Sequence, residues 1–292
     1  MRIAAVAYQC ERLSGWGAQK AKLDAILREA AADLVVFPEY AAMEAALITG
    51  PRSASISDWR DLAAERADKW VDQFRHMAQA HGCHIVAGSG PVVTARGVVN
   101  RSWLVAPDGS VAHQDKRLLL RYEREAFGMV AGEALRLFDT AIGKIGLLVC
   151  YDSEFPLQAR ALCDAGAEMI IVPSCTDLAA GQTRVRQSCR ARAIENQCLV
   201  VQAPLVGEVS GCDPIDRSTG RAAFFCPPDH GLPETGILAQ GETDTPGAVV
   251  AEVDPAAIAA PRRTGQVGNF ADWPGGLERV TPVTVPAGPA RA

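Results

Sequence analysis

The sequence has no run of basic residues interleaved with aromatic side chains, and it carries no excess of positive charge. Its 29 lysines and arginines stand against 34 aspartates and glutamates, which gives a formal net charge of −5. A protein that binds nucleic acid needs a positive patch to neutralise phosphates. We therefore expect no nucleic-acid partner.

The N-terminus lacks an apolar stretch long enough to cross a bilayer or to act as a signal peptide. The run over residues 3–8 is far shorter than the roughly 20 residues of a membrane span, and it has no small-residue cleavage site. We therefore expect a cytoplasmic protein with no membrane partner.

The nine cysteines include no CxxC pair, and the five histidines show no spacing typical of metal ligands. An odd number of scattered cysteines fits neither a disulfide framework nor a zinc knuckle. We expect no metal and no cofactor, and we expect most of the thiols to be small buried apolar groups.

What the sequence does contain is the composition of an ordinary globular protein, with 48% hydrophobic and 22% charged residues. At 292 residues the alternatives are one large domain or two small ones. Because no linker divides the chain, we predict one domain over residues 1–280. Residues 281–292 are rich in proline, valine and alanine without periodicity, which predicts an extended or disordered tail.

Apolar runs and helical periodicities alternate along the chain. Residues 3–8 form a short apolar run, and apolar side chains between 19 and 32 then recur at i, i+3, i+4 and i+7. Residues 34–37 form a second apolar run that stops at Pro38, which completes a strand–helix–strand unit. The same reasoning predicts further helices at 63–80, 156–165, 183–196 and 255–260, and further strands at 84–87, 102–106, 111–113, 145–149, 169–172, 199–202, 222–226 and 249–253.

A strong turn signal at residues 107–109 predicts a hairpin within this alternating pattern. A sheet that contains both strand–helix–strand units and a hairpin is mixed. We therefore predict an α/β fold, a layered sandwich of two mixed sheets with outer helices.

Cys150 stands at the end of a predicted buried strand, directly before a polar turn and a helix. Strand ends of this kind are where α/β folds expose reactive groups. Backbone N–H groups of the following turn favour a thiolate and can hold an oxyanion. Taken alone, Cys150 is more typical of a buried structural cysteine.

Two further segments carry charged residues at strand ends. Glu39 comes just after a buried strand that Pro38 stops, and Lys116 comes at the end of the predicted hairpin before an apolar run. Each residue taken alone is more typical of a solvated charge.

Taken in order, Phe37-Pro38-Glu39, Lys116 and Cys150-Tyr151-Asp152 resemble the Glu-Lys-Cys signature of the nitrilase superfamily of carbon–nitrogen hydrolases. The resemblance extends through residues 165–169, 172–174 and 190–197. It implies a four-layer αββα sandwich. It also implies a homodimer, or a larger homo-oligomer, that pairs through the helices flanking the nucleophile.

The resemblance also implies an amidase-like activity. Cys150 would be the nucleophile, Glu39 the general base, and Lys116 would stabilise the oxyanion together with the Tyr151 backbone N–H. The reaction would cleave a small-molecule amide or carbamoyl amide through a thioester and release ammonia or an amine.

Members of this superfamily often carry a second active-site glutamate, seven residues ahead of a glycine that closes the loop. Glu125 stands at that offset from Gly132, so we favour Glu125 over Glu123. The alternative is an exposed acidic turn in which Glu125 pairs with Arg121 or Arg124.

Glu154 marks a departure from several branches of the superfamily. In branches acting on carboxylate-bearing substrates an arginine lies a few residues after the nucleophile, whereas this sequence has Ser153 and Glu154 there. A carboxylate at this place would disfavour an anionic substrate and favour a neutral or cationic one. Alternatively, Glu154 forms a structural ion pair with Arg184 or Arg190.

Three other functions remain open at this point. Nitrile hydrolysis is the chemical neighbour, although Tyr151 after the nucleophile is more typical of amidase-like branches. The chain could also be a catalytically silent protein that uses the same fold to bind a partner. In a redox sensor, Cys150 would form a disulfide with a resolving thiol such as Cys175.

Overall fold

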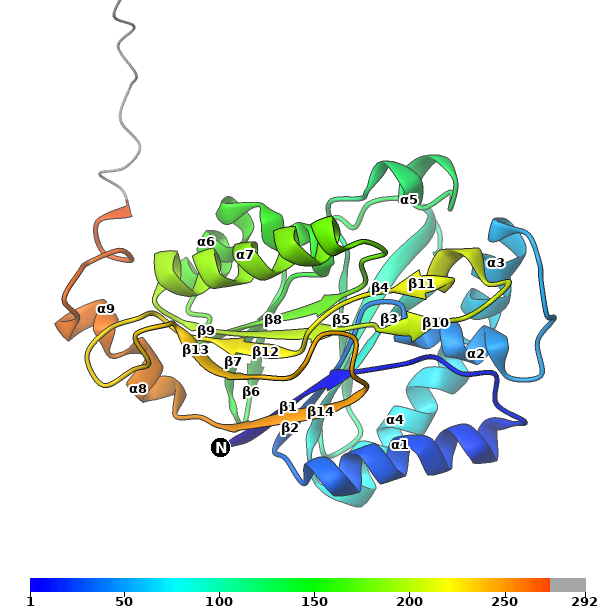
Figure 1. The fold of residues 1–292 in the computed structure, drawn as a ribbon, viewed down its shortest axis with the longest axis horizontal. Coiled ribbons are helices and arrows are strands. Elements are labelled where there is room, and N and C mark those ends of the chain that lie inside the picture. The colour runs from blue at the N-terminus through cyan, green and yellow to red at the C-terminus, as the bar shows by residue number, and fades with distance from the viewer. Residues whose placement is uncertain (274–292) are drawn as a thin grey trace, which may run out of the picture.

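Two six-stranded β-sheets pack face to face in the computed structural model, which describes residues 1–273 (Figure 1). In spatial order, the first sheet contains β14 (Gly247–Glu252), β1 (Arg2–Ala7), β2 (Leu34–Phe37), β3 (His84–Thr94), β4 (Gly97–Val105) and β5 (Val111–Asp115). The second contains β13 (Ile237–Gln240), β12 (Ala223–Phe225), β9 (Leu199–Pro204), β8 (Met169–Ser174), β7 (Gly143–Leu147) and β6 (Leu137–Thr140). A separate two-stranded ribbon joins β10 (Gly207–Glu208) to β11 (Arg217–Ser218).

Helices cover the outer faces of both sheets. The first sheet is covered by α1 (Trp16–Ala30) and α4 (Ala67–His81), and the second by α6 (Pro156–Asp164) and α7 (Ala179–Asn196) (Figure 1). The remaining helical segments are η1 (Ala41–Met43), α2 (Glu44–Leu47), α3 (Ile56–Glu65), α5 (Arg121–Glu125), η2 (Cys150–Glu154), η3 (Asp213–Ile215), α8 (Pro255–Ala259) and α9 (Pro261–Thr264). The predicted four-layer αββα sandwich is therefore confirmed.

The inner strand β2 and residues 3–7 of β1 are apolar because both of their faces are covered. In β1, Ile3 and Ala5 join the core between the two sheets, whereas Ala4 and Val6 join the core beneath α1 and α4. Successive side chains of a strand point to opposite faces, so a strand packed on both sides needs an unbroken apolar run. All four of these side chains are at most 1% exposed.

Both sheets are mixed, as predicted. β1, β2 and β3 run parallel, and the hairpin of β4 and β5 is antiparallel, with the predicted turn closed by a hydrogen bond from the Gly109 N–H to the Ala106 carbonyl at 2.9 Å. In the second sheet β7, β8 and β9 are parallel, and β6 and β12 are antiparallel neighbours at either side.

The structure corrects several predicted boundaries. The helix expected at 63–80 is two helices, α3 and α4, which meet at Arg66. Gly82 ends α4 in the left-handed conformation, close to the predicted end. The edge strands β6 and β13 were not predicted, because they are short and half-exposed and so lack a continuous apolar run.

Two earlier expectations fall partly or wholly beyond the described residues. The boundary at residue 280 and the tail over 281–292 lie within 274–292, outside the part of the chain that the structure describes. Within residues 1–273, no helix is long and apolar enough to span a membrane.

The carboxyl ends of three parallel strands carry polar groups to one place. β2 leads into Glu39, β7 leads into Cys150, and β8 leads into Cys175. One of these strands belongs to the first sheet and two belong to the second, so the site lies where the ends of both sheets meet.

Candidate active site

Four buried polar side chains from the first half of the chain form one connected cluster. The Lys116 ammonium donates to Glu39 Oε1 at 2.8 Å and to Glu123 Oε1 at 2.9 Å. The Asn100 amide donates to the same two oxygens, at 2.9 and 3.3 Å. Each of the four side chains belongs to a residue that is at most 1% exposed. Buried charges are tolerated when they are paired and hydrogen-bonded, and this cluster meets both conditions.

The turn that carries Glu39 is fixed by the neighbouring strand β3. The Tyr40 N–H donates to Ser89 Oγ at 3.1 Å, and the Ser89 N–H donates to the Pro38 carbonyl at 3.2 Å. Gly88 has φ +69°, and a Cβ there would lie 2.4 Å from the Pro38 carbonyl oxygen. Only glycine allows β3 to approach the Glu39 turn this closely.

The segment that carries Lys116 is tied to the nucleophile loop. Asp152, buried two residues after Cys150, accepts the Leu118 N–H at 2.8 Å and the Arg117 N–H at 3.2 Å. The Lys116 N–H donates to the Asn100 carbonyl at 2.8 Å. Asp152 thus ties the backbone after Lys116 to the nucleophile loop, and Asn100 ties Lys116 to β4.

Cys150 itself has an unusual backbone conformation. Its φ is +48°, in the left-handed region that side-chain-bearing residues rarely adopt. Ser153 Oγ donates to the Cys150 carbonyl at 2.6 Å, and the Cys150 thiol donates to the Cys175 carbonyl at 3.5 Å. Strained residues of this kind concentrate at functional sites, where the surrounding structure holds them in place.

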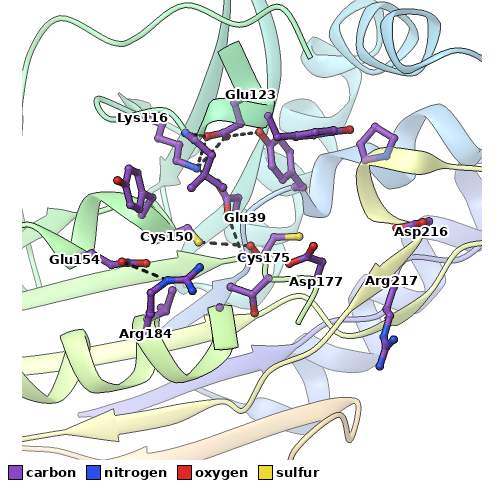
Figure 2. A pocket seen from close by; sticks show the side chains of 18 of the residues that line it. Glu39, Lys116, Glu123, Cys150, Glu154, Cys175, Asp177, Arg184, Asp216 and Arg217 are labelled. Atoms are coloured by element: carbon purple, nitrogen blue, oxygen red, sulfur yellow. Dashed lines mark hydrogen bonds and ion pairs between the residues drawn. The ribbon is translucent and has the colours of Figure 1, made fainter. Parts of the chain in front are cut away.

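Glu39 also bonds to the end of a strand of the second sheet. The Cys175 N–H, at the end of β8, donates to Glu39 Oε2 at 3.0 Å. Figure 2 shows Glu39 between the Lys116–Glu123 pair on one side and Cys150 with Cys175 on the other. The carboxylate of Glu39 is therefore shared between the charged cluster and the thiol.

Burial and neighbouring charges shift the acidity of each group. Burial and the Glu39 carboxylate hold the pKa of the Cys150 thiol well above its ordinary value, so the thiol is protonated at rest. Burial also raises the pKa of Glu39, although Lys116 opposes this. Burial disfavours the charged form of Lys116, but Glu123 and Glu39 outweigh it and hold the pKa of Lys116 well above its ordinary value.

Glu123 responds differently from Glu39. Burial disfavours its charged form, but Lys116 and the hydrogen bonds it accepts lower its pKa. Glu123 thus stays ionised as the counter-ion of Lys116, while Glu39, with a raised pKa, is suited to exchanging a proton.

The structure corrects the choice between the two glutamates that follow Lys116. Glu125 is 60% exposed in its side chain and pairs with Arg121 at 2.8 Å, which was the alternative considered for it. Glu123 is the residue beside Lys116, because it is the third residue of α5 and its Oε2 accepts the Leu120 N–H at 2.8 Å. This capping contact turns Glu123 inward and leaves Glu125 in solvent.

Replacing these two glutamates one at a time should separate their contributions. For Glu123→Gln we expect activity to fall about tenfold to a hundredfold, because the Lys116 ammonium loses one of two counter-ions. We also expect a lower melting temperature. The matched control, Glu125→Gln, removes only an exposed ion pair and should leave both unchanged. Equal losses of activity in the two variants would contradict this assignment.

The cluster opens into a pocket of about 310 Å³. Its lining includes Glu39, Lys116, Cys150, Tyr151 and Glu154. Of the two arginines suggested for Glu154 it is Arg184 that approaches it, at 3.7 Å, and Figure 2 shows this pair at the pocket wall.

Reasoning from the sequence missed three contributors to the site. Asn100 donates to Glu39 from β4, Tyr40 donates to Glu123, and the Cys175 N–H donates to Glu39. No sequence signal separates Asn100 from its polar neighbours Arg101 and Ser102 in the same strand. The contribution of Cys175 comes from its backbone, for which no residue type gives a signal.

The described residues show no gathering of side chains suited to a metal ion. Between residues 1 and 273, no three or more histidine, cysteine, aspartate or glutamate residues form such a group. All nine cysteines are free thiols, and Cys175 is the least buried of them.

Comparison with known proteins gives a consistent pattern. A sequence model of the carbon-nitrogen hydrolase family matches residues 2–263. The "Probable hydrolase YhcX" of Bacillus subtilis is 31% identical over 247 residues, which cover 85% of this chain and 48% of that protein. "Omega-amidase YafV" of Escherichia coli is 33% identical over 188 residues, which cover 62% of this chain and 65% of that protein. The chain thus spans less than two thirds of the length of either relative.

A solved structure extends the comparison to three dimensions. It is a mutant of the amidase from Nesterenkonia sp. AN1, with the acetamide moiety of fluoroacetamide added covalently at its active-site cysteine. The TM-score is 0.65 and the identity 23%, over 90% of this chain and 94% of that one. At this identity the likeness shows a shared fold.

Proposed function

Since this chain belongs to the carbon–nitrogen hydrolase family of the nitrilase superfamily, we propose that it hydrolyses a non-peptide amide bond through a thioester on Cys150. The observation that carries the proposal is that Glu39 lies between the Lys116 ammonium and the Cys150 thiol. One carboxylate oxygen faces the Lys116 ammonium at 2.8 Å, and the carboxylate also lies beside the Cys150 thiol. A base, a cation and a nucleophile thus meet in one pocket.

Acylation begins from a protonated thiol. Glu39 takes the thiol proton as the Cys150 sulfur bonds to the amide carbon, and it returns the proton to the nitrogen as the carbon–nitrogen bond breaks. The Lys116 ammonium, held by Glu39 and Glu123, would stabilise the oxyanion together with the Tyr151 N–H. This step releases ammonia or an amine.

Deacylation uses the same groups, with water as the nucleophile and the Cys150 sulfur as the leaving group. Glu39 takes a proton from water as the water oxygen attacks the thioester carbon, and the sulfur leaves with that proton. The products are a carboxylic acid and the regenerated thiol. A raised pKa suits Glu39 to both steps, because it must accept and release a proton within one cycle.

An ammonia-release screen over amides, carbamoyl amines and nitriles tests the proposal. We expect amides or carbamoyl amines to be turned over, and hydroxylamine added to the reaction should intercept the thioester as a hydroxamate. Turnover confined to nitriles would favour the neighbouring nitrilase chemistry. A Cys150 thiol inert to iodoacetamide, together with no turnover of any compound, would favour a catalytically silent binding protein.

The charge of the pocket mouth suggests which amides to test first. The outer lining holds four carboxylates against two guanidinium groups, namely Glu154, Asp177, Asp213 and Asp216 against Arg184 and Arg217. Figure 2 shows Asp177 and Asp216 on the opposite side of the pocket from Glu154. An excess of negative charge favours neutral or cationic substrates over anionic ones.

A matched amide series should reveal this preference. We expect kcat/KM to be at least about tenfold lower for 4-carbamoylbutanoate than for pentanamide, with 5-aminopentanamide at or above pentanamide. Glu154→Gln should reduce the difference in kcat/KM between 4-carbamoylbutanoate and pentanamide, because it removes a carboxylate from the pocket wall. A preference for 4-carbamoylbutanoate would contradict the electrostatic argument.

The quaternary structure remains a prediction from family resemblance. We propose a homodimer or larger homo-oligomer that pairs through the helices next to Cys150, which are α6 and α7. Sedimentation equilibrium of the full chain measures this directly, and a monomer at all concentrations would contradict it.

A further inference from the structure

Asn100 is buried in β4 and touches both carboxylates of the site. Its side-chain nitrogen lies 2.9 Å from Glu39 Oε1 and 3.3 Å from Glu123 Oε1, and its backbone carbonyl accepts the Lys116 N–H at 2.8 Å. The residue is 0% exposed. An amide NH₂ group has two N–H bonds, so it can serve two acceptors at once.

The hydrogen bonds of Glu39 can be counted oxygen by oxygen. A carboxylate oxygen has about two acceptor positions. On Oε1 these positions are filled by the Lys116 ammonium at 2.8 Å and by the Asn100 amide. On Oε2 one is filled by the Cys175 N–H at 3.0 Å. The unfilled position of this carboxylate is therefore on Oε2.

We propose that Asn100 is a positioning residue that closes Oε1 of Glu39, so that the thiol proton of Cys150 is exchanged at Oε2. The assignment rests on the proposed function in one respect, the role of Glu39 as the base. Asn100 fixes the orientation of the carboxylate and supplies a neutral donor to a site that already holds two negative charges and one positive charge.

The chemistry of the site explains why an amide suits this position. A carboxylate of the same shape would add a third negative charge between Glu39 and Glu123, and a hydroxyl would offer one donor for two acceptors. A second lysine would compete with Lys116 for both carboxylates. Hydrogen bonds to an ionised carboxylate favour the ionised form, so we expect the bond that Asn100 donates to favour ionised Glu39.

Ser102 provides a matched control on the same strand. It lies two residues after Asn100 and is also 0% exposed, and its hydroxyl has no hydrogen-bond partner among the described residues. Residues i and i+2 of a strand share one face. Ser102→Ala therefore changes the same buried face without removing a contact to either carboxylate.

The experiment measures how the rate of Cys150 alkylation by iodoacetamide depends on pH, by peptide mapping of the intact full-length protein. Because Glu39 takes the thiol proton, alkylation below the titration of the thiol itself should follow the ionisation of Glu39, and removing a donor from Glu39 raises the pKa of Glu39. For Asn100→Ala we therefore expect the inflection to move to higher pH by about one unit. With an amide identified by the screen, kcat should fall about tenfold to a hundredfold, with KM changed less than about twofold. Ser102→Ala should keep the inflection of the unmodified protein.

The outcomes separate this inference from the function itself. An Asn100→Ala protein that is folded and shows the original inflection overturns the role of Asn100. If that variant does not fold, Asn100→Leu, which has a similar volume and no donor, takes its place, and the same test applies to it. A shifted inflection in Asn100→Ala without turnover of any amide would contradict the proposed function but support the role of Asn100. Amide turnover that depends on Cys150, with no shift of the inflection in Asn100→Ala, would support the proposed function and overturn the role of Asn100.

Discussion

Cys150→Ala should reduce amide turnover by about 10⁴-fold or more while leaving the fold intact. The covalent route needs the sulfur as nucleophile, and no other thiol in the pocket replaces it, because the Cys175 side chain contacts Ser218 Oγ at 3.7 Å rather than Glu39. Alanine keeps the same left-handed backbone conformation, so the strain at this position does not change. We expect the loss of the buried sulfur to cost about 1 kcal/mol of unfolding free energy or less.

Cys226→Ala is the matched control for this variant. Cys226 is also buried, but it packs in the core between the two sheets and does not line the pocket. We expect ammonia release close to that of the unmodified protein. Turnover by Cys150→Ala at a comparable rate would contradict the thioester route.

Lys116→Met should produce the second large effect, on activity and on stability together. Methionine fills a similar volume without charge, so Glu39 and Glu123 would face each other without a counter-ion. Removing one member of a buried charge cluster typically costs about 3–5 kcal/mol of folding free energy. The loss of the oxyanion donor should lower kcat by about 10²–10³-fold.

The stability loss in Lys116→Met should grow with pH. Without the ammonium, the pKa of Glu39 in the folded state rises further above its unfolded value, and the pKa of Glu123 is no longer held below its unfolded value. The folded state then binds more protons than the unfolded state, so stability falls as pH rises through that interval. The melting temperature of Lys116→Met should therefore lie further below that of the unmodified protein at pH 8 than at pH 5.

Lys144→Met controls for the loss of a lysine as such, because Lys144 is exposed on β7. It should melt like the unmodified protein at both pH values. A Lys116→Met protein whose deficit is the same at pH 5 and pH 8 would show that the two carboxylates do not depend on Lys116 for their charge.

Much of the layered fold was predictable from local patterns. Strands buried on both faces, such as β2 and β8, produce continuous apolar runs, and Gly82 marks the end of α4 through its left-handed conformation. The edge strands β6 and β13 bury too little surface to leave such a run. Arg66, where α3 meets α4, is neither glycine nor proline, so nothing local marks that break.

The site was predictable to the extent that strand ends identify it. Glu39, Lys116 and Cys150 each follow a strand, and the structure brings them together, while their catalytic roles stay predictions until the variants are measured. The choice between Glu123 and Glu125 could not be made from spacing, because the two residues lie on different faces of the short helix α5 and the start of that helix decides which face turns inward. The bridging contacts of Asn100 depend on tertiary structure that spacing does not encode.

The hydrogen bond between the Cys175 N–H and Glu39 joins residues 136 positions apart in the chain. The cluster around Lys116 is attached to the first sheet and the Cys150 thiol to the second, so neither half of the chain contains a complete reaction centre. Closing such long loops costs conformational entropy, and the packing of the two sheets offsets that cost. We therefore expect catalysis to return during refolding only once the two sheets have packed together.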